Sequence, residues 1–262
     1  MAPVYADHPF SLIPTPVFLA KSKDPNAKTD KFDEIASEMA NVHNIMLRGL
    51  NSIYLQAPHI SQGDIIPFCR YISGFCSFIH IHHNGEEEQF FPEVEKMAGV
   101  KGLMDGNVEQ HRVFQAGLKG LEEYTAAVLA GKEEYSGEKI KNLVDGFGAV
   151  LVQHLTDEIP TLLGLREYED KMAGLEKAIQ EEAETSMKTL GNFGMVWCFA
   201  NLDIHFENDI WLGFPPAPAP VKFLFRNLFW WFYPDARKFG SVDRQGKLKP
   251  LYAVPVEGEK AS

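Results

Sequence analysis

The chain has 262 residues, of which 45% are hydrophobic, so it can bury a sizeable core. Its formal net charge of −11 excludes a surface built for nucleic-acid backbones, because such binding needs clustered lysine and arginine. The sequence holds no run of about 18 uncharged apolar residues, and its first residues do not have the pattern of a signal peptide. Three cysteines are too few for a disulfide framework. We therefore expect no transmembrane segment, no nucleic-acid partner and a cytoplasmic location.

Apolar residues recur at three- and four-residue steps in much of the chain, the pattern of amphipathic helices. This pattern predicts four long helices, over residues 30–57, 66–97, 103–129 and 137–168. Pro92 and Pro160 fall inside the second and the fourth of them, where a proline removes a backbone donor or bends the helix. The prediction is an all-α fold, with an up-down-up-down four-helix bundle over residues 31–168 that holds a dinuclear metal centre.

The two ends of the chain follow a different pattern. Residues 1–30 are interrupted by prolines and should form an irregular segment. Residues 169–262 start with an amphipathic helix over residues 170–190 and continue as an aromatic, proline-rich extension. The aromatic run at residues 221–233 is too short to span a bilayer. We expect the extension to pack on the bundle; lining a substrate pocket, or docking on a membrane or a partner, are the alternatives.

Histidine and glutamate interrupt the apolar face of each predicted helix. In the second and fourth helices they stand four residues apart, which puts both side chains on one face. Burying several imidazoles and carboxylates without a cation would cost several kcal/mol for each charge. Mixed nitrogen and oxygen ligation suits iron, manganese or zinc, and bridging glutamates favour a redox pair over a structural zinc. We therefore predict two iron ions, in preference to manganese or zinc, with the ligands His43, His82, Glu86, His111, His154 and Glu158.

The second helix offers two histidine–glutamate pairs at this spacing. His82 and Glu86 continue the apolar stripe of the helix, whereas His83 and Glu87 lie about 100° around it. The phase favours the first pair, and His83 is then expected to be a partner or a surface group. Glu87 is expected to act close to the metals, handling protons or serving as an additional ligand. The choice between the two pairs stays open at this point.

These residues resemble those of the hemerythrin-like (HHE cation-binding) family. The resemblance covers about residues 31–168 and rests on His43, the block at residues 82–92, the run at residues 109–111 and the pair in the fourth helix. Residues 230–234 are similar to the tail of fungal members. The resemblance implies a non-haem di-iron centre, bridged by the two glutamates of the predicted set, with its four histidines as terminal ligands.

The chain departs from oxygen-carrying members of that family in two places. Those members have a second histidine one turn after the ligand of the third helix, and here that position is Gln115. The acidic ligand of the fourth helix is Glu158, four residues after its histidine, rather than an aspartate at five. Fewer histidines would leave more coordination positions open to water, dioxygen or a substrate.

The open positions favour an enzyme over a simple carrier. We predict a non-haem di-iron oxidoreductase or oxygenase that binds O2 and activates it to oxidise a small organic substrate. Neither a dinucleotide-binding loop nor a Walker pattern is present, so electrons would come from an external donor. The alternative is a non-enzymatic protein that binds or senses O2, NO or iron. A third interpretation is a regulatory module that folds around iron and presents its aromatic tail to a partner.

Overall fold

The computed structural model describes residues 2–255 of the protein. Over that range the secondary structure is helical, with no β-strand and an isolated antiparallel bridge between Val242 and Leu248. The predicted all-α class is therefore confirmed. Among the described helices, none combines the length and the apolar character that crossing a bilayer requires.

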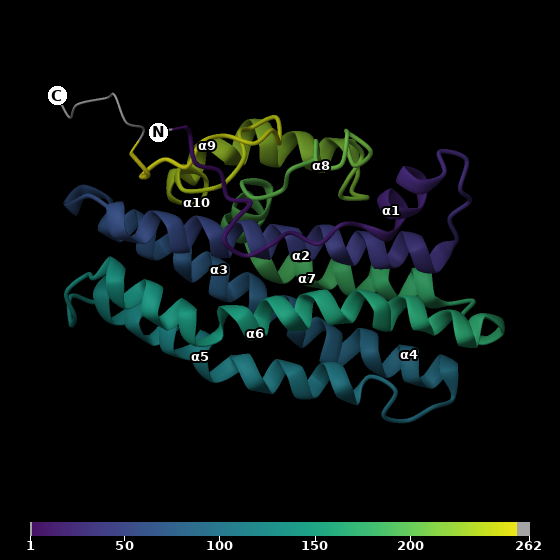
Figure 1. The fold of residues 1–262 in the computed structure, drawn as a ribbon. Helices are drawn as coiled ribbons and strands as arrows, with labels where there is room; N and C mark the ends of the chain where they lie inside the picture. Colours follow the sequence, from purple (N-terminus) through teal and green to yellow (C-terminus); the bar gives the residue numbers. More distant parts are fainter. Residues whose placement is uncertain (1, 256–262) are drawn as a thin grey trace.

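Four long stretches of helix lie side by side and give the molecule its elongated shape (Figure 1). Helix α6 packs against both α2 and α5, and α3 packs against α5 and, over a shorter length, against α2. The interior between them is apolar, as the sequence pattern predicted. The four stretches are α2 (Lys31–Gln56), α3 (Ile65–Gly85) with its continuation α4 (Phe91–Ala98), α5 (Asp105–Leu129) and α6 (Gly137–Gly164).

Side-chain caps explain where two of these helices begin. The Asp30 carboxylate accepts hydrogen bonds from the backbone N–H groups of Phe32 and Asp33, and the Asp33 side chain accepts one from the Asp30 backbone in return. This reciprocal arrangement satisfies donors that have no partner within the helix. Ser136 caps α6 in a similar way by accepting from the backbone of Lys139.

The helix that begins as α3 changes register close to the predicted ligands. Residues Glu86–Phe90 form a π-helical turn, in which the N–H of Phe91 donates to the carbonyl of Glu86, five residues back. Pro92 follows directly, and it has no N–H to continue regular α-helical bonding. The predicted effect of this proline thus appears as a local change of register, placed where Glu86 enters the interior.

Helix α7 (Leu175–Phe199) lies outside the four stretches and packs along α3. The predicted helix over residues 170–190 corresponds to its first part. At Gly191 the backbone has φ of 62°, which favours glycine, and the chain then continues in a second helical part to Phe199. Trp197 of this second part is fully buried, with its ring centroid 5.4 Å from that of Phe78 on α3. This contact fixes α7 to the face of α3.

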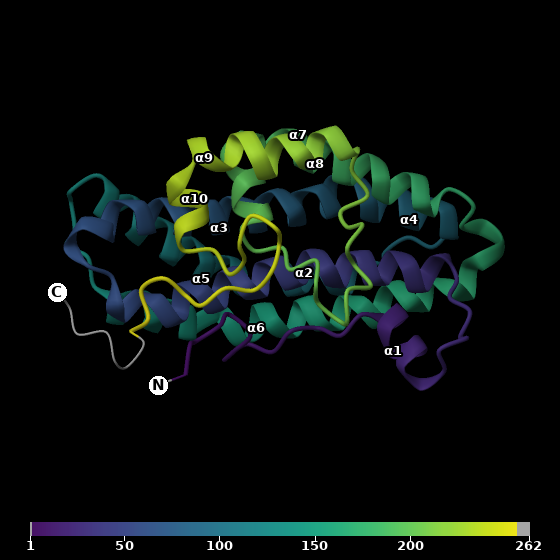
Figure 2. The same cartoon turned by 90° about the horizontal axis from the view of Figure 1, so that it is seen from above.

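The remaining segments cover the outside of these helices. Figure 2 shows α8 (Ala219–Leu224), α9 (Trp230–Phe232) and α10 (Pro234–Lys238) gathered on the side of α7. The N-terminal segment, expected to be irregular, includes a short helix, α1 (Pro16–Lys23), capped by Thr15. Asn44 of α2 holds this segment by accepting a hydrogen bond of 2.8 Å from the backbone N–H of Ile13.

Candidate metal centre

Two groups of potential metal ligands lie buried in the interior of the protein. In each group, one ligand atom from every residue lies within 4.8 Å of those of the others. We call the two groups the three-histidine position and the two-histidine position, and Glu86 belongs to both. The three-histidine position consists of His83, Glu86, His111 and His154, and the two-histidine position of His43, His82 and Glu86.

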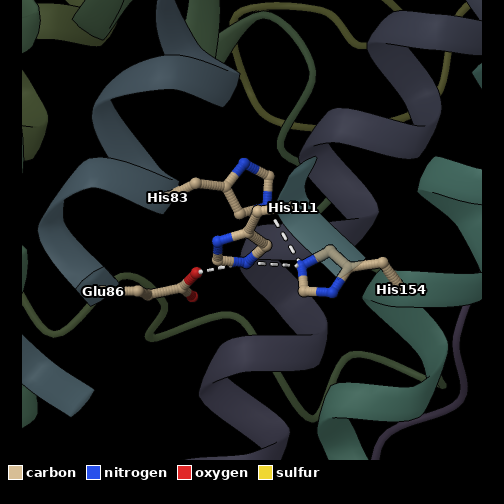
Figure 3. A group of neighbouring side chains, drawn as sticks. All are labelled: His83, Glu86, His111 and His154. Atoms are coloured by element: carbon tan, nitrogen blue, oxygen red, sulfur yellow. Dashed lines mark hydrogen bonds and ion pairs between the residues drawn. The ribbon is translucent and has the colours of Figure 1, made fainter. Parts of the chain in front are cut away.

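At the three-histidine position, imidazoles from α3, α5 and α6 point toward one another (Figure 3). The Nε2 atom of His154 lies 3.1 Å from Nε2 of His111 and 3.2 Å from Nε2 of His83. Glu86 turns its Oε2 atom toward the group, 3.6 Å from Nε2 of His111. One carboxylate and three ring nitrogens thus surround one point.

At the two-histidine position, Nε2 of His82 lies 3.3 Å from Nε2 of His43 and 2.8 Å from Oε1 of Glu86. Glu86 therefore directs one oxygen toward each position. Oε2 of Glu158 lies 3.5 Å from Nε2 of His43 and 3.8 Å from Nε2 of His154. Both glutamates stand between the two positions, as carboxylates that bridge a pair of ions would.

The outer nitrogens of three histidines determine which ring nitrogen carries the proton. Each Nδ1 faces an oxygen that can only accept, so Nδ1 is protonated and Nε2 keeps its lone pair for a metal. Gln110 presents its oxygen because its amide nitrogen donates to Asp157 at 3.2 Å. The three contacts are His43 with the Leu155 carbonyl at 2.8 Å, His111 with Glu87 at 2.6 Å, and His154 with Gln110 at 3.1 Å.

With the protons on Nδ1, the interior contains unprotonated Nε2 atoms and carboxylates but, within residues 2–255, no positively charged group to face them. The facing Nε2 atoms of His111 and His154 both carry lone pairs, so no hydrogen stands between them. All four carboxylate oxygens of Glu86 and Glu158 are buried without a hydrogen bond among the described residues, and the His82 Nε2 atom lies 2.8 Å from Oε1 of Glu86. Cations at the two positions would give both oxygens of Glu86 and the facing imidazole nitrogens a partner. The donor set of nitrogen and oxygen without sulfur fits iron, manganese or zinc.

The acid–base properties of the site follow from its burial. Burial lowers the pKa of His154 to about 2, and the neighbouring histidines contribute in the same direction. Burial also raises the pKa of the Glu86 and Glu158 carboxyls well above their usual range, with repulsion from Glu182 adding to the effect at Glu86. The imidazoles are thus neutral, the form that binds metals, and the carboxylates need a nearby positive charge to stay ionised.

The structure brings together all six residues that the sequence pattern predicted as ligands, and it adds His83. The prediction had treated His83 as a partner or surface group, whereas it is only 4% exposed and its Nε2 atom belongs to the three-histidine position. Consecutive residues of a helix point about 100° apart, so His82 and His83 can each face a different position. His82 and His83 thus lie in different groups of potential ligands, Glu86 belongs to both groups, and Glu87 belongs to neither.

The glutamine at position 115 is the sequence signal that could have pointed to His83. Since this position carries no histidine, another histidine could have been sought to complete the group of ligands. Gln115 is exposed on the outside of α5, so it takes no part in the site. His83 on α3 brings a third imidazole to the three-histidine position. The expectation of an additional open coordination position stays a prediction.

Glu87 lies beyond the ligand atoms. It accepts the hydrogen bond from Nδ1 of His111 described above, on the side of the ring away from the metal position, and its side chain is 33% exposed. A carboxylate in this place fixes the orientation of the imidazole and makes it a better ligand. Its predicted role in handling protons remains a prediction.

A cavity of about 730 Å³ adjoins the two-histidine position at His82. Its walls come from α2, α3, α7 and the proline-rich residues 214–218, so the C-terminal extension forms one side of it. The volume is within the range of pockets that hold small molecules. The metal centre thus has a neighbouring space for a ligand.

Comparisons with known proteins agree with this site. The family model described as "Hemerythrin HHE cation binding domain" matches residues 34–165, which include every potential ligand named above. A protein of Cryptosporiopsis sp. (strain 8999), named "Dimeric xanthone biosynthesis cluster protein R11", is 31% identical over 255 residues, covering 96% of this chain and 94% of that protein. No solved structure matches the chain. The chain belongs to the hemerythrin HHE cation-binding domain family.

Proposed function

We propose that the protein is a non-haem di-iron protein that binds O2 and uses it to oxidise a small organic molecule held in the cavity beside His82. This proposal is carried by the place where the cavity meets the centre. His82 lines the cavity and belongs to the two-histidine position, so a molecule in the cavity would lie next to that position. That position has one nitrogen ligand fewer than its neighbour. Two histidines with a carboxylate, leaving other positions open, form a donor set typical of non-haem iron oxygenases.

Within this proposal, the iron ions supply the electrons and the coordination positions that dioxygen needs. The chain would supply the residues that hold the ions: the carboxylates of Glu86 and Glu158, and the imidazoles of His43, His82, His83, His111 and His154. We also propose that α2, α3 with α4, α5 and α6 form the up-down-up-down bundle predicted from the sequence, with α7 outside it. Mostly apolar cavity walls would keep bulk water from the open positions.

The relative supports a particular kind of substrate. Its printed name places it in a biosynthesis cluster for a dimeric xanthone. Phe78, Phe199 and Phe214 line the cavity of the present chain, and aromatic walls suit an aromatic ligand. We therefore propose a small aromatic molecule as the substrate, an external electron donor and a cytoplasmic location.

The test is iron content followed by oxygen consumption. The purified protein is loaded with ferrous iron without oxygen, its iron content per chain is determined, and O2 uptake is recorded with and without added phenolic compounds. The proposal predicts two iron ions per chain and an uptake that exceeds the iron content only when a substrate is present. His82→Ala should lose at least one iron ion, whereas His8→Ala should keep both. Two iron ions retained by His82→Ala, or zinc alone in the purified protein, would contradict it.

A non-enzymatic role in binding or sensing O2, NO or iron is the second candidate. It is supported by the position of the ligands, since all of them lie in the matched domain and none comes from the extension that lines the cavity. In this case, the reduced protein would take up O2 or NO in proportion to its iron and release it again. No added aromatic compound would then increase the uptake.

A further inference from the structure

One buried carboxylate in the cavity belongs to neither group of potential ligands. Glu182 of α7 lines the cavity and is only 6% exposed. Its Oε1 atom accepts a hydrogen bond of 2.5 Å from the Ser186 hydroxyl, while Oε2 accepts none from the residues described. No lysine or arginine of the described chain forms an ion pair with it. This mostly buried side chain of the cavity wall therefore keeps one carboxylate oxygen without a hydrogen-bond partner among the described residues.

The end of α3 is shaped to admit this carboxylate. A Cβ atom built on Gly85 would lie 2.2 Å from Oε1 of Glu182, far closer than any real contact. Glycine at position 85 thus lets the carboxylate approach the helix between the ligands His82 and Glu86. Helix α7 lies beyond the residues that the family model matches, so Glu182 is a feature of this extension.

The chemistry of the cavity wall restricts what can bind there. The wall contains no lysine or arginine, but five glutamates: Glu34, Glu38, Glu176, Glu182 and Glu184. A ligand with a carboxylate would be repelled by these charges and would find no lysine or arginine in the wall to pair with. The rest of the wall is mostly apolar and includes the aromatic rings named above together with Met39, Met187 and Met195. Thioethers and aromatic rings favour an aromatic ligand.

Among the five glutamates of the wall, Glu182 is the only buried one, and this also restricts the polar group of the ligand. A hydroxyl has one donor hydrogen, which matches Oε2 of Glu182. An ammonium has three donors, and among apolar walls some of them would stay without a partner, at a cost in binding. The glutamates of the wall disfavour acids, and with Glu182 as the only buried carboxylate of the wall an ammonium would keep donors without a partner.

We propose that the cavity binds a neutral aromatic molecule with a hydroxyl group, and that Glu182 accepts the hydrogen of that hydroxyl beside His82. This inference rests on the proposed function, because the oxidation of the bound molecule is part of that proposal. It specifies the chemical class of the substrate. Glu182 would act as a specificity-determining residue, contributed to the centre by the extension.

Calorimetric titration with four naphthalene probes tests this proposal. The protein is iron-loaded, reduced and kept free of oxygen, so that binding is measured without turnover. We expect 1-naphthol to bind more tightly than naphthalene and 1-naphthylmethylamine, and 1-naphthoate to bind most weakly. Glu182→Leu should weaken 1-naphthol about tenfold or more and leave naphthalene unchanged, because a hydrogen bond to a charged group is lost. The control Glu181→Leu changes the exposed neighbour on the same helix and should bind all four probes as the original protein does.

Glu182→Gln provides a second variant of nearly the same shape. It removes the charge, so its affinity for 1-naphthoate should increase relative to the original protein. The proposal is wrong if 1-naphthoate or the amine binds more tightly than 1-naphthol, if Glu182→Leu leaves the affinity for 1-naphthol unchanged, or if no probe binds. Tight binding of 1-naphthol without any oxygen consumption in air would instead refute the proposed function and leave this inference standing.

Discussion

His83 offers the sharpest test of the metal centre, because the sequence pattern assigned it no place there. We choose His83→Leu, which removes the ring nitrogen and keeps an apolar side chain of similar volume among its neighbours. The His83 ring lies with its centroid 4.3 Å from that of His111 and 5.1 Å from that of Phe114. The substitution should therefore disturb the packing less than the coordination. We expect one of two iron ions to be lost, and the one at the two-histidine position to remain.

The magnitude follows from the ligand set. Loss of a group that merely orients a ligand weakens metal binding about 10–100-fold, so loss of the ligand itself should cost at least about 100-fold. If free iron stands at about 100 times the dissociation constant, binding stabilises the original protein by about 2.7 kcal/mol, and after a 100-fold weakening by only about 0.4 kcal/mol. The difference of about 2.3 kcal/mol corresponds to a melting temperature lower by about 5–9 °C for a protein of this size.

The assay combines iron content, competition with a chelator and thermal unfolding at fixed free iron. His80→Leu is the matched control, because His80 lies on the same helix but its side chain is 37% exposed and pairs only with Glu122. This control should keep two iron ions and the original melting temperature. If His83→Leu keeps two ions at the original affinity, His83 is not a ligand and the three-histidine position is wrongly assigned.

Three further predictions concern the surroundings of the site. Glu87→Gln should weaken iron binding about 10–100-fold without lowering the iron content at saturation, measured by chelator competition. Gly49→Ala should lower the free energy of unfolding by about 1–3 kcal/mol in urea, because its Cβ would lie 2.6 Å from a tryptophan ring of α7. Arg166 lowers the pKa of Asp30 to about 2 from 3.8, so this partly exposed pair should contribute less than about 1 kcal/mol, fully present above pH 3.8 and lost as the pH falls toward 2.

A specific result would contradict each of these predictions. Gly146→Ala meets nothing within 4 Å on α6 and should be neutral or stabilising, so a loss of stability equal to that of Gly49→Ala would contradict the steric argument. For the pH effect, the stability difference between the original protein and Arg166→Gln should shrink on acidification. A difference that grows below pH 3.8 would show that the sign is wrong. For Glu87→Gln, an unchanged iron affinity would leave its proton-handling role as the remaining hypothesis.

The C-terminal extension, residues 169–262, shows which structural features could be predicted from the sequence pattern and which could not. They placed a helix over residues 170–190 and an aromatic segment after it, and they allowed the extension to line a pocket. They did not show that Glu182 points inward, because its surroundings depend on how α7 packs against α3. A glutamate in a helix rich in glutamate and lysine has no distinguishing local pattern. Its small exposed fraction and its contact with Gly85 exist only once the two helices are in place.

The sequence by itself determined the helical class and the predicted ligand residues, His43, His82, Glu86, His111, His154 and Glu158. Both follow from local periodicity, since a four-residue step on a helix fixes which side chains share a face. The tertiary structure decided which ring nitrogens meet, that Glu86 turns one oxygen to each position, and that His83 takes part. These depend on the packing of helices distant in sequence and on the π-helical turn that begins at Glu86, which no periodicity within one segment specifies. The cavity beside His82 likewise exists only because α7 lies against α2 and α3.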